Sequence, residues 1–187
     1  MNLYLDTATE DFVLVLFNDD FEVIDHVLYL NYRKKVDLIV NECLNMMKKH
    51  NLEYKDLNGL YTNIGPGFFT GVRASLVFFR TIALLTKVPL FTTTSFDILL
   101  KQNNQSILTL DAQGNKMYFF DKEMYQKNND IKKSITVKTK DQTVIDKINY
   151  QSMIDNFKLY KDIFNQETNA LLTEPLYIKS PQIGAIK

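Results

Sequence analysis

Short apolar segments separated by polar corners fill the first thirty residues of the chain. Leu3–Thr7, Phe12–Asn18 and Glu22–Leu30 are rich in β-branched and aromatic residues, and polar residues stand at Thr9–Asp11 and Asn18–Asp20. Such side chains fit the pleated surface of a strand. The pattern therefore predicts an antiparallel meander of three strands.

The apolar positions then change to a helical period. Between Arg33 and Lys49 they recur at intervals of three and four, which places them on one face of a helix. The sequence therefore predicts an amphipathic helix in this segment. The residues on its apolar face are Val36, Ile39, Val40, Cys43, Leu44 and Met47.

Strand and helix patterns alternate through the middle of the chain. Leu57–Gly65 predicts a buried strand, and Thr70 is expected as the N-cap or in the first turn of a helix that ends near Thr86. Val88–Thr93 predicts a further strand. Three meander strands followed by alternating helix and strand indicate an α/β fold with a mixed sheet.

A short helix and a hairpin are expected next. Thr94 or Ser95 can cap a helix that runs through Lys101. Ser106–Ala112 and Lys116–Asp121 flank a turn that contains glycine, as in a β-hairpin. These elements extend the alternation of helix and strand into the second half of the chain.

The last third of the chain carries weaker patterns. Residues 125–142 are polar and rich in lysine, but acidic and amide residues are mixed through them, so they predict an exposed hairpin or loop and not a nucleic-acid-binding arm. Glu174–Ser180 has the composition of one more strand.

The helix predicted from Thr70 to Thr86 is apolar around almost its whole circumference. A helix of this kind must be covered on both sides. A sheet can cover one side, and the other is covered either by the rest of this chain or by packed helices of another protein. The apolar residues are Val72, Ala74, Leu76, Val77, Phe78, Phe79, Ile82, Ala83, Leu84 and Leu85.

Composition narrows the possible functions. The 22 basic and 22 acidic residues balance, so any contact with RNA is expected to be shared with a partner. One cysteine, Cys43, cannot form an internal disulfide, and two histidines offer few metal ligands. The N-terminus lacks the pattern of a signal peptide, and Arg80 interrupts the longest apolar run. We expect a cytoplasmic protein without a membrane span.

The run "TNIGPGFFTGVRAS", Thr62–Ser75, allows two interpretations. A strand, a glycine-containing turn and a helix N-terminus together can hold an anion, although the spacing is not that of a Walker A loop. Alternatively, the glycines allow a tight corner and a close approach of helix and sheet. Of the adjacent aromatics Phe68 and Phe69, one is expected to face a partner or the neighbouring domain. The candidate anion-site residues are Gly65, Gly67, Thr70, Gly71 and Arg73.

Three motifs in order resemble those of the bacterial TsaB family, also called YeaZ. They are "LYLDTATEDFVLVLF", "NIGPGFFTGVRAS" and "TLDAQGNKMYFF", within residues 1–120, with a fainter similarity in "EPLYIK". The chain departs from the family at Phe68, where serine is usual, and at Gln113-Gly114, which replaces a basic pair. It also lacks the common histidine near Arg33–Lys35.

The resemblance implies an α/β fold of the actin/Hsp70-like (ASKHA) type, with mixed sheets flanked by helices and a reduced second subdomain. We expect an N-terminal subdomain over residues 1–102 and a C-terminal one over residues 103–187.

The resemblance also implies a role in making threonylcarbamoyladenosine beside the tRNA anticodon. TsaB family proteins are regarded as non-catalytic platforms that pair with the catalytic protein TsaD, with TsaE in a larger complex. ATP and metal then belong to the partners, and no cofactor is expected on this chain. A homodimer is expected when TsaD is absent, and tRNA is reached through the complex.

The expected interface with TsaD, or with a second copy, lies on the first two helices. An apolar helical face should then be exposed in the single chain, and changing Phe79 or Leu76 to Asp should abolish the complex while the fold is kept. The interface residues predicted are Val36, Ile39, Val40, Cys43, Met47, Phe69, Val72, Leu76, Phe79 and Ala83.

A small actin-like nucleotide-dependent kinase or phosphotransferase is the alternative function. Asp6 would hold a metal-bound phosphate and Asp111 would act as the base, although both can equally be carboxylates that shape turns. Asp6–Asp11 contains no glycine to let backbone amides approach a phosphate. His26 and His50 cannot form a paired-histidine metal site, and Cys43 has no histidine partner in sequence for a peptidase.

Overall fold

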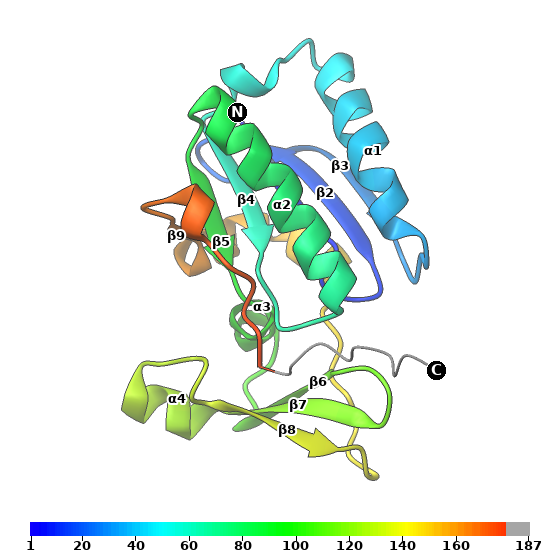
Figure 1. Cartoon of the computed structure of the whole chain (residues 1–187), viewed down its shortest axis with the longest axis vertical. Helices are drawn as coiled ribbons and strands as arrows, with labels where there is room; N and C mark the ends of the chain where they lie inside the picture. The colour runs from blue at the N-terminus through cyan, green and yellow to red at the C-terminus, as the bar shows by residue number, and fades with distance from the viewer. Residues whose placement is uncertain (179–187) are drawn as a thin grey trace, which may run out of the picture.

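A computed structural model describes residues 1–178 and shows two lobes (Figure 1). The larger lobe contains a six-stranded sheet in the order β3-β2-β1-β4-β5-β9. The first three strands form the expected antiparallel meander, while β1, β4 and β5 run parallel to one another, so the predicted mixed sheet is confirmed. Its strands are β1 (Asn2–Asp6), β2 (Phe12–Phe17), β3 (Val23–Tyr29), β4 (Gly59–Asn63), β5 (Leu90–Thr93) and β9 (Asn165–Gln166).

Helices α1 (Lys35–Lys49) and α2 (Phe69–Thr86) lie side by side on one face of this sheet (Figure 1). Both predicted helices are therefore confirmed. Alternate residues of each strand point to this face, and Leu14 and Leu16 of β2 pack there with the helices. Because the opposite face is also covered, all six residues of β2 are buried.

The opposite face of the sheet packs against the smaller lobe. Val13, Val15 and Phe17 of β2 lie in this second core, where the Phe17 and Phe157 ring centres are 4.9 Å apart. The elements around this core are α3 (Ser95–Gln102), β6 (Ile107–Asp111), β7 (Lys116–Asp121), β8 (Ile135–Thr139), α5 (Tyr150–Asp155) and the 3₁₀ helix η2 (Phe157–Ile163).

An N-cap marks the start of the short helix expected after β5, which is confirmed. Thr94 is its N-cap, and the Thr94 hydroxyl accepts a hydrogen bond from the Asp97 N–H. The hairpin of β6 and β7 is also present, with Gln113 and Gly114 at positive φ in its turn. These local signals suffice because each element is stabilised by residues close to it in sequence.

The polar stretch of residues 125–142 holds more structure than its sequence predicted. Helix α4 (Lys122–Asn128) begins at Asp121, whose carboxylate accepts from the Met124 N–H, and β8 then adds a third strand to the small sheet. Both elements are too short and too exposed to show a clear hydrophobic period. The sequence patterns also did not predict the helices α5 and η2.

The strand expected over Glu174–Ser180 is wrong for its described residues. Residues 174–178 belong to no strand, and Lys179 and Ser180 lie outside the described residues. Instead, the Leu176 N–H donates to the Ile64 carbonyl at 2.7 Å. A single backbone bond of this kind holds an extended segment without forming a ladder.

The described C-terminal part of the chain returns to the larger lobe. Strand β9 pairs with β5, and the Glu167 N–H donates to the Leu90 carbonyl at 2.8 Å. Arg80 of α2 donates to the carbonyls of Thr173, at 3.0 Å, and Leu171. Residues 165–176 of the expected second subdomain therefore lie against the first sheet.

Helix α2 is long and apolar enough to cross a membrane, although Arg80 lies within it. Its contacts are those of a core helix, since Leu76 and Phe79 are completely buried against the sheet. Length and composition alone do not distinguish a buried core helix from a membrane span. The packing accounts for the apolar inner face of α2.

We expect Arg80→Ala to release the segment around Thr173 from α2. The change removes two hydrogen bonds from a charged donor, and these contribute about 1.5–3 kcal/mol each when well formed. Amide hydrogen exchange of residues 165–176 should become faster, while exchange in β1 and β4 stays unchanged. Uniformly faster exchange across both lobes would contradict this local role.

Candidate functional site

A buried carboxylate stands at the carboxyl end of β1. Asp6 is completely buried, and its Oδ1 accepts from the Ala8 N–H at 2.7 Å. Its Oδ2 accepts from the hydroxyls of Tyr4 and Tyr150, each at 2.7 Å, and from the Asn63 Nδ2 at 3.0 Å. Burial, and then the Asp6 charge, hold the pKa of both tyrosines well above their usual value. Asp6 is therefore surrounded by donors and faces no open space for a metal ion.

Asn63 extends this network to the glycine-containing loop. Its Oδ1 accepts from the Gly65 N–H at 2.8 Å, and its Nδ2 donates to the Ser95 hydroxyl at 2.9 Å. The Ser95 N–H in turn donates to the Gly65 carbonyl at 2.9 Å. The carboxyl ends of β1 and β4 are thus connected to the start of α3 by buried hydrogen bonds.

The glycines of this loop are explained by close packing. A Cβ on Gly67 would lie 2.2 Å from the Ala8 carbonyl oxygen, and one on Gly71 would lie 1.9 Å from that of Thr7. Gly65 has a φ of 96°, in the left-handed region that favours glycine. The corner interpretation therefore accounts for all three residues.

The anion-site interpretation stays a prediction. Thr70 and Arg73 are exposed on the first turn of α2, and the Arg73 guanidinium lies 5.1 Å from the Phe69 ring centre. The two adjacent aromatics have separate environments. Phe69 packs on Tyr177, while the Phe68 ring lies 4.6 Å from the Lys35 ammonium and lines a cavity.

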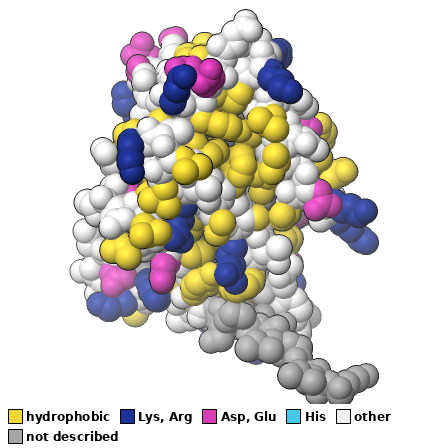
Figure 2. All heavy atoms as spheres, turned by 45° about the horizontal axis from the view of Figure 1, so that its top comes forward, with side chains coloured by type: hydrophobic (Ala, Val, Ile, Leu, Met, Phe, Trp, Pro, Cys, Tyr) yellow, Lys and Arg dark blue, Asp and Glu magenta, His cyan; other side chains and the backbone are white. Residues whose placement is uncertain are grey.

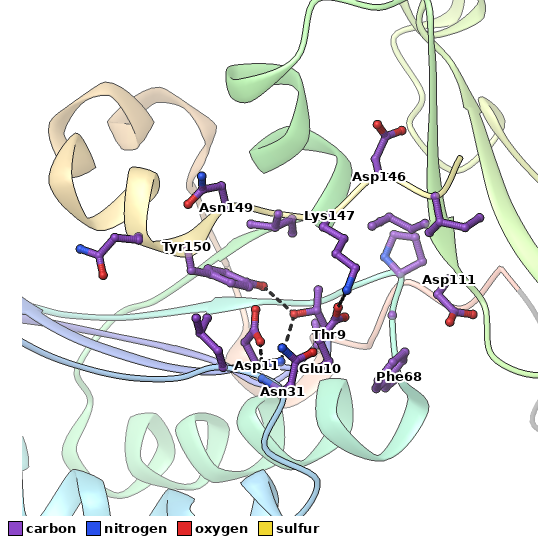
Figure 3. Close-up of a pocket in the computed structure, with 18 residues that line it drawn as sticks. Thr9, Glu10, Asp11, Asn31, Phe68, Asp111, Asp146, Lys147, Asn149 and Tyr150 are labelled. Atoms are coloured by element: carbon purple, nitrogen blue, oxygen red, sulfur yellow. Dashed lines mark hydrogen bonds and ion pairs between the residues drawn. The ribbon is translucent and has the colours of Figure 1, made fainter. Parts of the chain in front are cut away.

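A cavity of about 700 Å³ lies between the two lobes (Figure 3). We call it the interlobe cavity. One wall comes from the turn after β1, from Leu30 and Asn31, and from the loop before α2, and the other from the end of β6 and the segment leading into α5. Its polar residues include Thr9, Glu10, Asp11, Asn31, Asp111, Asp146, Lys147, Asn149 and Tyr150.

Carboxylates dominate the charge of the cavity walls. Glu10 pairs with Lys147 at 2.7 Å, and Asp111 pairs with Lys140 at 2.8 Å. Asp11 is only 8% exposed, accepts from the Asn31 N–H at 2.8 Å, and forms no ion pair with any residue from 1 to 178. Burial, and then the charge of Glu10, raise the pKa of the Asp11 carboxyl, although the hydrogen bond from Asn31 and the charge of Lys35 oppose them.

Lys35, the first residue of α1, lies behind the same wall. It is only 6% exposed, and burial lowers the pKa of its ammonium, although Asp6, Glu10 and Asp11 oppose this effect. Lys35 stands in the segment where the sequence lacks the histidine common in TsaB proteins. The sequence did not single out Lys35, Asp11 or Lys147 as site residues, because their proximity depends on the packing of three separate segments.

The prediction that the interface residues of α1 and α2 form an exposed surface is largely wrong. Seven of its residues are buried between the helices and the sheet, because each helix turns its most apolar stripe inward. Val36 and Phe69 are half-buried, and Val40 is exposed. The buried residues are Ile39, Cys43, Met47, Val72, Leu76, Phe79 and Ala83.

Other apolar residues of the same helices do face outward. Val40 of α1 and Val77 of α2 are each 52% exposed, and Leu44 and Leu84 are each 40% exposed. Figure 2 shows hydrophobic side chains gathered over a broad area of the surface. The apolar residues of α2 thus form two stripes, an inner one buried in the core and an outer one exposed on the surface. We call Val40, Leu44, Val77 and Leu84 the outer helix face.

Cys43, His50 and His26 were the other residues considered for catalysis or metal binding, and each lies in the core, in an ion pair or on the surface. Cys43 is completely buried, and burial raises the pKa of its thiol. His50 lies 2.7 Å from Asp25, which also pairs with Lys49, while His26 is exposed on β3. Within residues 1–178, no group of three or more histidine, cysteine, aspartate or glutamate side chains is arranged to hold a metal ion.

Comparison with known proteins gives the family. The family model described as "TsaD: tRNA N6-adenosine threonylcarbamoyltransferase" matches residues 30–176. A protein of Buchnera aphidicola subsp. Schizaphis graminum, named tRNA threonylcarbamoyladenosine biosynthesis protein TsaB, is 28% identical over 127 residues. The chain belongs to this family, on its TsaB/YeaZ branch.

Solved structures of TsaB/YeaZ proteins share the fold. YeaZ from Pseudomonas aeruginosa has a TM-score of 0.53 and 17% identity, covering 64% of this chain and 58% of its own. A second structure is that of an uncharacterised protein with similarity to peptidase YeaZ from Pseudomonas aeruginosa. It has a TM-score of 0.59 and 13% identity, and the match covers 95% of this chain and 99% of that chain. The expected actin-like ASKHA fold is therefore confirmed.

The match to two of these TsaB/YeaZ relatives is partial. The match to the Buchnera protein covers 57% of this chain and 58% of that protein, and the chain likewise spans 58% of Pseudomonas aeruginosa YeaZ. The second solved structure, in contrast, is covered almost completely.

We expect Asp6→Ala to destabilise the whole fold. The change leaves the buried hydroxyls of Tyr4 and Tyr150 and the Asn63 amide without their common acceptor, at a cost of roughly 3 kcal/mol or more. Urea unfolding followed by circular dichroism would measure the loss. Asp20→Asn, in an exposed turn, should leave the unfolding free energy unchanged. Equal stability of Asp6→Ala and wild type would contradict the role assigned to Asp6.

We expect Asp11→Asn, in contrast, to stabilise the protein near neutral pH. The folded pKa of Asp11 is raised, so the folded state binds its proton more tightly, and stability falls as pH rises from the unfolded toward the folded pKa. Asparagine keeps an acceptor for the Asn31 N–H without the charge. The gain should be full above the folded pKa, shrink as the pH falls, and vanish below the unfolded pKa. Urea titrations across a pH series would measure it.

Proposed function

We propose that this TsaB/YeaZ protein acts in making threonylcarbamoyladenosine in tRNA, as a non-catalytic platform that pairs with TsaD. Family membership supports the pathway, because the curated relative carries that role in its name. The observation that carries the platform role is the outer helix face, where two valines on adjacent helices are each half exposed. The protein is then cytoplasmic, where its tRNA substrate is found.

The network around Asp6 supports a non-catalytic role. In an actin-like kinase this carboxylate would hold a metal-bound phosphate, but here it accepts four hydrogen bonds from buried donors. The turn from Asp6 to Asp11 also has no glycine to bring backbone amides close to a phosphate. ATP and metal are accordingly assigned to the partner proteins, with TsaE in the larger complex.

The outer helix face suits a helical partner. Side chains three and four residues apart form ridges that interdigitate with those of a second helix pair. Leu44 follows Val40 by one turn on α1, and Val77 and Leu84 are two turns apart on α2, so both helices present apolar ridges. TsaD is the proposed occupant, and a second copy takes its place when TsaD is absent. Because the chain carries no net charge, tRNA is reached through the complex.

The alternative function is a nucleotide-dependent kinase or phosphotransferase that uses Asp6 and Asp111. Asp111 lines the interlobe cavity, but it already pairs with Lys140 and accepts from the Gln113 N–H at 2.7 Å. Calorimetric titration with magnesium and ATP decides between the two functions. Tight binding with turnover would replace the platform role.

The interface is tested with exposed positions, since Phe79 is in the core and Phe79→Asp would unfold the chain. Val77→Asp and Val40→Asp should keep the fold and weaken the complex with TsaD by at least about tenfold, because each places a charge in an apolar interface. The partner is TsaD from the same source, and light scattering gives the mass of the co-purified species.

Leu159→Asp is the matched control, because Leu159 is exposed on η2, on the opposite side of the sheet. This variant should form the same one-to-one complex as the wild type. A complex that survives the Val40→Asp, Val77→Asp double change would place the interface elsewhere. A wild-type chain that ignores TsaD would overturn the platform role itself.

A further inference from the structure

The two long helices begin next to each other, at an end of the helix pair that lies before the outer helix face. Lys35 starts α1, and a Cβ added to Gly71 in the first turn of α2 would lie 3.3 Å from the Lys35 Cε. The opposite ends also lie together, because Lys48 and Thr86 line the same surface hollow. The helices are therefore parallel (Figure 1), and the segments that lead into them share one end of the pair.

Three cations at this end lack an ion-pair partner. Arg33 and Lys34 precede α1, Arg73 lies near the start of α2, and all three are exposed. None of them forms an ion pair or a side-chain hydrogen bond with any residue from 1 to 178. Their segments, 29–38 and 66–76, hold one acidic residue, Asp37. The chain is neutral as a whole, but a surface charge acts over about 8 Å at physiological salt, so the local excess of cations matters.

Aromatic rings lie among these cations. Tyr29 is 38% exposed and Tyr32 is 42% exposed, and their ring centres are 5.7 Å apart. At the start of α2, the half-buried Phe69 ring lies 5.4 Å from that of Tyr177 and 5.1 Å from the Arg73 guanidinium. Large rings gathered at a surface indicate a contact site. We call Tyr29, Tyr32, Arg33, Lys34, Phe69 and Arg73 the helix-start surface.

The turn that carries the two tyrosines is held in place from inside the protein. Asn31 has a φ of 52°, and its N–H donates to the buried carboxylate of Asp11 at 2.8 Å. The Tyr29 hydroxyl donates to Glu42 at 3.0 Å, and the Tyr29 ring centre lies 6.0 Å from that of Phe12. The tyrosine pair is thus positioned before a ligand arrives, so less conformational entropy is lost on binding.

Unpaired cations beside exposed rings match the chemistry of single-stranded RNA. Arginine and lysine bind the phosphates of the backbone, and unstacked bases stack on aromatic side chains and guanidinium planes. A double helix would hide the faces of its bases and leave the rings without a partner. A small free anion would use the cations alone.

We propose that the helix-start surface binds a single-stranded segment of RNA. Phosphates lie on Arg33, Lys34 and Arg73, and bases stack on Tyr32 and Phe69. The choice of RNA rests on the role in tRNA modification proposed above. The contact gives this chain its own share in holding the RNA, beside the surface that pairs with TsaD.

Fluorescence anisotropy of the purified full chain with a labelled single-stranded RNA of about twelve nucleotides tests the proposal. We expect saturable binding whose log affinity falls against log salt concentration with a slope of about −2, since each of three phosphate contacts contributes about −0.7. The Arg33→Ala, Arg73→Ala double change should weaken binding by at least about tenfold and bring the slope close to about −0.7.

The matched control is the Lys48→Ala, Lys87→Ala double change. Both lysines are exposed at the other end of the same helix pair, so this variant loses the same charge and should bind RNA as the wild type does. Tyr32→Ala should weaken binding by about fivefold or more, because a stacked base loses its ring. Tyr32→Phe keeps the ring and should restore wild-type affinity. Unchanged unfolding temperatures show that the variants are folded.

Three results would overturn the proposal. The first is a wild-type chain that binds no RNA, and the second is an equal loss of affinity in the two double variants, because total charge alone would then explain binding. The third is wild-type affinity in Tyr32→Ala together with complete displacement of the RNA by tripolyphosphate at the same phosphate concentration, which would leave an anion site only.

The pairing with TsaD is measured separately by light scattering. A chain that pairs with TsaD but binds no RNA refutes this inference and leaves the platform role intact. A chain that binds RNA but does not pair refutes the platform role alone. Loss of the TsaD complex in Tyr32→Ala, with RNA binding unchanged, would make the helix-start surface a protein contact and overturn the assignment to RNA.

Discussion

The buried carboxylate of Asp6 is the interaction on which the arrangement of the two lobes depends. It accepts hydrogen bonds from Tyr4 and Asn63 in the larger lobe and from Tyr150 in α5, which lies 144 positions away in sequence. Removing any donor leaves buried polar groups unpaired, and such losses cost more than the bond itself contributes. Through Asn63 and Ser95, the same network fixes the loop before α2 and the start of α3. An actin-like fold that elsewhere supports phosphate chemistry here has this carboxylate enclosed by protein donors.

The corner at Gly65–Gly71 transmits that constraint to α2. Gly67 and Gly71 let the loop and the helix approach the Thr7–Ala8 backbone so closely that no side chain fits between them. The Thr7 hydroxyl donates to the Gly71 carbonyl at 2.7 Å, which fixes where α2 begins. The direction of α2 then determines which of its residues enter the core, and the outer helix face is what remains. The platform surface is thus a consequence of the packing at the corner.

The outer helix face and the interlobe cavity differ in their chemistry. The outer helix face is apolar, as the centre of a contact between proteins requires, and none of its four residues lines the interlobe cavity. The interlobe cavity is concave and has carboxylates on opposing walls with apolar residues between them.

The sequence by itself determined the local elements and the family. The meander, both long helices, the Thr94 cap and the β6–β7 hairpin follow from residues that interact with near neighbours, and the glycine-containing motif identifies the TsaB/YeaZ branch. Only the tertiary structure decided which stripe of α2 is covered, because periodicity marks an apolar face without naming what packs on it. It also decided the return of β9, the contact between Asp6 and Tyr150, and the grouping of Glu10 and Asp11 with Lys35. These features join segments distant in sequence, and no local pattern encodes such contacts.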